Sequence, residues 1–228
     1  MKKVDFPADK GSQITGIIGI LAGAFLILYI IEIILEQGRV PTPEQQLSVF
    51  NANQSTYAFF GAAAALFGTF FIAFAGGFAR IVRQKSPSVS YAAAFLVGAG
   101  ALTEAISNNL YVGSLFAISA APSTATYATD ATYFAAVVFN FTSILEESIG
   151  VLLIGLGSLL FAWAIWKGEI FPKWLSYVLL VGGVLGILAS APPLGFVGLI
   201  FALGFAVLDA VWAFVAGIVL LRSKSTTA

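Results

Sequence analysis

The sequence predicts an all-α, polytopic membrane protein: a single transmembrane domain over residues 1–228, built as a bundle of six helices. Of its 228 residues, 59% are hydrophobic and only 10% are charged, a balance that would leave a soluble domain with a large apolar surface. Six apolar runs are long enough to cross a hydrocarbon core about 30 Å thick, which takes about 20 helical residues. Basic residues cluster at alternate ends of these runs, so composition, run length and charge agree.

The first run covers residues 14–35 and follows Lys2 and Lys3. It is longer than the apolar region of about 7–15 residues in a cleavable signal peptide, so we predict an uncleaved first span. Polar or Pro-containing segments bound the later runs. The fifth begins at Pro172, a residue favoured in the first turn of a helix. The later spans are predicted at residues 57–79, 89–118, 133–166, 172–190 and 196–221.

Basic residues set the predicted orientation, because Lys and Arg near the ends of spans are retained on the cytoplasmic side. With six spans, 10 of the 11 basic residues fall on one side, and only Arg39 falls on the other. Both termini are therefore predicted to be cytoplasmic. Trp and Tyr residues are placed at the two interfaces: Trp163, Trp166, Trp174, Tyr91 and Tyr177 at the inner one, and Tyr57, Tyr127 and Tyr133 at the outer one.

Several kinds of site are excluded by residue type. The chain has no His and no Cys, which removes disulfides, thiolate chemistry and the usual ligands of zinc and haem. It has no Gly-rich phosphate loop and no Ser-His-Asp set. The formal net charge is zero, so no nucleic-acid partner is indicated. We expect no cofactor and no enzymatic activity.

Acidic residues within the spans carry the chemical signal, because a carboxyl group in hydrocarbon is costly and usually faces the bundle interior. Asp209 lies about 13 residues, or roughly 20 Å, from either end of its span, near the middle of the bilayer. Glu104 and the neighbouring Glu146 and Glu147 lie roughly 24–30 Å from the cytoplasmic ends of their helices. These acids are predicted to cluster toward the outer half.

Polar residues accompany these acids at helical spacing. Glu104, Ser107, Asn108 and Tyr111 share one face of the third predicted helix, which therefore cannot face lipid. Asn140, Ser143 and Glu147 follow a similar pattern in the fourth. The candidate residues for binding a proton or cation are thus Asp209, Glu104, Glu147, Asn108 and Asn140.

Apart from Lys173 in the first turn of the fifth span, no Lys or Arg lies within a span, so these acids must bond to neutral polar groups or water, bind a cation, or stay protonated. One hypothesis is a water-filled cavity, open to the outside, in which Glu104, Glu147 and Asp209 bind a proton or cation. These three carboxylates also suit a hard metal ion, but spacing alone leaves the metal undetermined. Alternatively, the third and fourth helices, each about 30 residues long, protrude from the bilayer and their acids are simply solvated.

Small residues recur four positions apart, as in Gly19 with Gly23 and Gly182 with Gly186. This spacing lets helices approach closely and is typical of packing within a bundle, so it does not indicate an oligomeric state.

The second half of the chain resembles a family of six-helix prokaryotic membrane proteins, the domain-of-unknown-function family numbered 4386. The resemblance rests on a Pro-basic-Trp-Leu start to the fifth helix and on Gly-rich flanks, in Gly155-Leu-Gly157, Trp166-Lys-Gly168, Phe171-Pro-Lys-Trp-Leu175, Gly182-Gly183, Trp212 and the segment from Gly217 to Arg222. It implies a multi-pass protein of the plasma membrane and no particular activity.

Two hypotheses of function follow. The first is a small proton- or cation-linked transporter or channel that uses Glu104 and Asp209, with an unknown solute and with membrane lipids as its other partners. The second is a non-transporting accessory or sensory membrane protein. The arrangement of Glu104, Glu147 and Asp209 in space distinguishes them.

Overall fold

The computed structural model describes residues 10–37, 43–120, 125–168, 171–191 and 195–222, and each of these segments is almost wholly helical. No strand occurs within these ranges. The helices are α1 (Lys10–Gln37), α2 (Pro43–Ala52), α3 (Gln54–Val82), α4 (Pro87–Ser119), α5 (Ala125–Ser143), α6 (Val151–Lys167), α7 (Lys173–Ala189) and α8 (Gly195–Arg222), with a π-helical segment, η1 (Ile144–Gly150), between α5 and α6. The predicted all-α bundle is confirmed.

Five helical segments are long and apolar enough to cross a membrane: Lys10–Ile31, Gln54–Val82, Pro87–Ser119, Tyr133–Lys167 and Val197–Arg222. They match the first four and the last of the expected spans. The expected span at 172–190 is α7, an apolar helix of 17 residues, slightly below the length that a perpendicular span needs. It nevertheless packs against both α6 and α8 as a member of the bundle.

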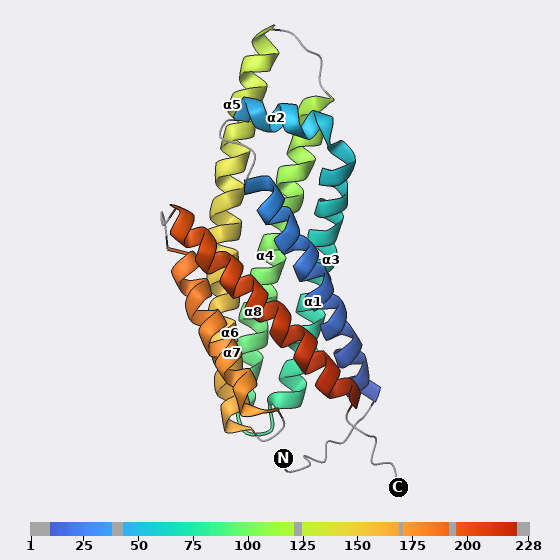
Figure 1. Ribbon diagram of the computed structural model, residues 1–228, viewed down its shortest axis with the longest axis vertical. Helices are drawn as coiled ribbons and strands as arrows, with labels where there is room; N and C mark the ends of the chain where they lie inside the picture. The colour runs from blue at the N-terminus through green and yellow to red at the C-terminus, as the bar shows by residue number, and fades with distance from the viewer. Residues whose placement is uncertain (1–9, 38–42, 121–124, 169–170, 192–194, 223–228) are drawn as a thin grey trace.

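The five long helices and α7 form a closed ring. Each of α1, α3, α4, α6, α7 and α8 packs against the next in chain order, and α8 returns to pack against α1 (Figure 1). Close approaches at glycine make these contacts possible. A Cβ on Gly217 of α8 would lie 2.7 Å from the carbonyl oxygen of Gly16 in α1, and a Cβ on Gly183 of α7 would lie 2.7 Å from that of Gly155 in α6. The expected packing of small residues within the bundle is therefore confirmed.

The described basic residues gather at one end of the bundle, here called the basic end. Arg80 at the end of α3 lies directly against Gly11 at the start of α1, and Phe78 of α3 lies 4.9 Å, between ring centroids, from Phe171 beside the start of α7. The other described basic residues stand at or beside helix ends that lie at this end of the bundle in Figure 1: the start of α1 (Lys10), the end of α3 (Arg83 and Lys85), the end of α6 (Lys167), the start of α7 (Lys173) and the end of α8 (Arg222).

The opposite end carries α2, a helix that the sequence analysis did not predict. It crosses the bundle near α3, α4 and α5 (Figure 1). Phe50 of α2 is fully buried, with ring centroids 5.2 Å from Tyr57 and 4.8 Å from Phe116. Tyr57, which was expected at the outer interface, has its ring covered by α2 and is only 7% exposed. Tyr133, by contrast, is exposed, and Tyr127 lies outside the residues whose side chains are described.

Candidate functional site: a buried pair of carboxyl groups

Glu104 is buried in the interior of the bundle, at 5% exposure. It lies on a face of α4 that also carries Ser107 and Asn108, both buried. The face meets Gly150 at the end of η1, where a Cβ would come within 2.7 Å of Glu104 Cγ. The glycine thus leaves room for the acidic side chain. Burial argues against the alternative in which Glu104 is simply solvated.

Asp209 is buried at 2% exposure, in agreement with its expected interior position. Ser158 Oγ of α6 donates a hydrogen bond to Asp209 Oδ1 over 3.3 Å. Gly182 of α7 lies on another side of the carboxyl group, because a Cβ at this position would be 3.7 Å from Oδ1. Three helices therefore enclose the Asp209 carboxyl group: α6, α7 and its own helix α8.

These two buried acids are far apart in the sequence but close enough in the bundle to influence each other electrostatically. The Glu104 carboxyl group interacts electrostatically with that of Asp209, and we call the two the Glu104–Asp209 pair. No described Lys or Arg lies near this depth, because the described basic residues gather at the basic end. Two negative charges in a surrounding of low dielectric repel strongly, so simultaneous ionisation of both acids without a counter-charge is unfavourable.

The other predicted site residues are distributed differently. Asn108 is buried on the same face of α4 as Glu104. Asn140 of α5 is exposed and does not join the pair. Glu147 belongs to η1, but its side chain is outside the described part of the structure. Among the residues described, no group of three or more His, Cys, Asp or Glu side chains is placed to hold a metal ion.

Three features of this site were missed by the sequence analysis. Ser158, rather than Asn108 or Asn140, supplies the hydrogen bond to Asp209. The depth of Ser158 in its helix could have indicated this role. Counted from the basic end, Ser158 lies nine residues, or about 14 Å, from Lys167, and Asp209 lies 13 residues, or about 20 Å, from Arg222. The glycines that face the two carboxyl groups and the π-helical segment η1 were also missed. Segments of π-helix within α-helices are frequent at functional sites.

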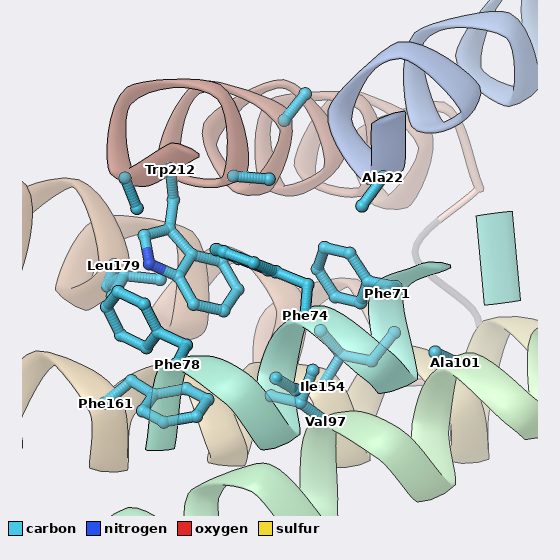
Figure 2. Packing of buried hydrophobic residues seen from close by; sticks show 14 of the residues in the cluster. Ala22, Phe71, Phe74, Phe78, Val97, Ala101, Ile154, Phe161, Leu179 and Trp212 are labelled. Carbon is cyan, nitrogen blue, oxygen red and sulfur yellow. The ribbon is translucent and has the colours of Figure 1, made fainter. Parts of the chain in front are cut away.

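An aromatic cluster fills the bundle between the pair and the basic end. We define it as Trp212, one turn beyond Asp209, with Phe71, Phe74, Phe78 and Phe161. The Trp212 ring lies between 5.0 and 5.7 Å from each of these phenylalanine rings, and all five side chains are fully buried (Figure 2). The indole Nε1 of Trp212 makes no hydrogen bond to any described group. This layer is apolar and tightly packed.

The comparison with known families gives a match over most of the chain. Residues 17–221 match the family described as "Domain of unknown function (DUF4386)". The similarity thus extends well beyond the second half, in which the sequence motifs were noticed. No curated protein and no solved structure matches the chain.

Proposed function

We propose that this chain, which belongs to the domain-of-unknown-function family DUF4386, is a small transporter. It uses the Glu104–Asp209 pair to couple the movement of a proton or cation to that of a solute. The proposal rests on one observation: two acids, from α4 and α8, are buried within the bundle and interact electrostatically, and the described basic residues lie elsewhere, at the basic end. Intramembrane acids in such positions are typical of proton and ion pathways.

The position of the pair within the ring supports this role. The two acids come from helices that are not neighbours around the ring, and the hydrogen bond from Ser158 adds a third helix. A proton or cation that binds between the carboxyl groups reduces the repulsion between α4 and α8. Binding therefore favours one arrangement of these helices over another, which is the requirement for coupling.

A second candidate function is a non-transporting sensory or accessory protein that responds to protonation of the pair. The aromatic cluster favours this candidate, because five fully buried rings pack between the pair and the basic end. In the transporter, this layer is the closed side of the site and must separate during the cycle. In the sensor it stays closed.

Flux in reconstituted liposomes separates the two candidates. The purified protein is placed in liposomes that contain a dye sensitive to protons, Na⁺ or K⁺, the gradient of the matching ion is imposed, and a panel of small solutes is supplied in turn. The transporter predicts movement of protons or of one of these cations above that in protein-free liposomes. Equal rates in both kinds of liposome, for all three ions, would leave the sensory protein as the function.

We further propose that the protein resides in the plasma membrane with both termini in the cytoplasm, so that the basic end faces inward. Because the chain lacks Cys, single cysteines can be introduced and labelled with an impermeant reagent on intact cells. Cysteines beside Glu44, Pro122 and Pro192 should react, whereas those beside Lys85, Lys167 and Lys224 should react only after the cells are opened. Labelling of the Lys85 site on intact cells would contradict this topology.

A further inference from the structure

We propose that the end of α6 and the start of α7 bind the headgroup of an anionic phospholipid. The site consists of Trp163, Trp166, Lys167, Lys173 and Tyr177, here called the α6–α7 patch. This inference is independent of the proposed transport function, since the patch lies at the basic end and includes neither acid of the pair.

Two lysines of the patch are held over tryptophan rings. Lys167 Nζ lies 4.8 Å from the ring centroid of Trp163, and Lys173 Nζ lies 5.2 Å from that of Trp166. Tyr177 packs edge-on against Trp166, with ring centroids 5.4 Å apart. Contact with a ring face positions an ammonium group, while the N–H donors that point away from the ring stay available to an anion. The lysines are therefore organised for a ligand before it arrives.

The rings themselves are on the outer surface of the bundle. Trp163 is 53% exposed, Trp166 is 42% exposed and Tyr177 is 52% exposed. Tryptophan and tyrosine with one apolar and one polar edge prefer the depth of the lipid headgroups. At that depth the acyl chains contact the rings while the phosphate reaches the lysines. This combination favours a lipid over a free phosphate ion, which has nothing to place against the rings.

The turn between α3 and α4 provides a natural comparison, because it also carries basic residues at the same end. Arg83 donates a hydrogen bond to the Tyr91 hydroxyl over 2.6 Å, and Arg80 lies against Gly11 of α1. Lys85 follows in the turn. This turn has more basic residues than the α6–α7 turn, but no tryptophan accompanies them. A preference for anionic lipid that depends on the α6–α7 patch therefore reflects a local site rather than overall surface charge.

Quenching of tryptophan fluorescence by brominated lipids tests the proposal. Three of the four tryptophans, Trp163, Trp166 and Trp174, are exposed near this turn, whereas Trp212 is fully buried. The full-length protein is reconstituted in phosphatidylcholine with a fixed fraction of brominated phosphatidylglycerol or brominated phosphatidylcholine. We expect quenching to show a preference for phosphatidylglycerol over phosphatidylcholine near these tryptophans, of about fivefold for each lysine near the surface. The double variant Lys167→Gln with Lys173→Gln should lose this preference.

The matched control removes two charges from the other turn, through Arg83→Gln with Lys85→Gln, and should keep the preference. Equal quenching by the two brominated lipids in the unmodified protein would overturn the proposal. So would an equal loss of preference in both double variants, which would indicate surface charge alone. Replacing chloride by inorganic phosphate at the same ionic strength should leave the preference unchanged; its loss would show that the occupant is a free anion.

Discussion

Asp209→Asn is expected to abolish the ion-coupled flux of the reconstituted protein while leaving it folded and inserted. Asparagine keeps the shape of the side chain and can still accept the hydrogen bond from Ser158, which now spans 3.3 Å. It removes ionisation, and with it the electrostatic interaction with Glu104. Flux should fall to the rate of protein-free liposomes, and any pH dependence of cation binding should disappear.

A matched control for this variant is Asp130→Asn, which neutralises an exposed acid on α5, outside the pair. It should transport at the rate of the unmodified protein. Glu104→Gln should reproduce the defect of Asp209→Asn, because each substitution removes one of the two interacting carboxyl groups. Normal flux and normal pH dependence in Asp209→Asn would show that this residue is a packed polar group and would refute the proposed role.

Trp212→Ala is expected to produce the largest loss of stability among single substitutions in the aromatic cluster. The indole is fully buried and contacts four phenylalanine rings. Replacing a buried Trp or Phe side chain by alanine lowers the free energy of unfolding by about 3–5 kcal/mol in protein interiors. Part of this loss comes from lost van der Waals contacts, which do not depend on the presence of water. The melting temperature in detergent should drop accordingly.

Trp163→Ala is the matched control, since the side chain is 53% exposed on the adjacent surface of α6. It should change the melting temperature much less than Trp212→Ala. A similar drop for the two variants would contradict the packing described for the aromatic cluster. Because no hydrogen bond from Trp212 Nε1 to a described group is present, Trp212→Phe should retain most of the stability that alanine loses.

The membrane bundle could be predicted from the sequence because run length and charge placement depend on local composition. Asp209 could be predicted to face inward for the same reason, since its depth follows from counting residues to the helix ends. The helix α2 could not be predicted in this way. It is short and lies at the end of the bundle, where Phe50 is held by contacts with α3 and α4 that arise only after folding.

The electrostatic interaction between Glu104 and Asp209 was suggested as a hypothesis but could not be established from the sequence. It depends on the order of helices around the ring, in which α8 closes against α1 and so brings its inward face toward α4. Ser158 was missed because a single serine in an apolar helix usually satisfies itself with a backbone carbonyl, as Thr142 does with Val138. Its role depends on the position of α8, a partner 51 residues away in the sequence.

The infrared absorption of the carboxylic C=O stretch reports whether the Glu104–Asp209 pair binds a proton. Difference spectra between alkaline and acidic conditions are recorded for the reconstituted protein, Glu104→Gln and Asp209→Asn. We expect a protonation band in the unmodified protein that shifts or vanishes in each single variant, because the two carboxyl groups interact, and that persists in Asp130→Asn. A spectrum that neither variant changes would contradict a shared proton site at these residues.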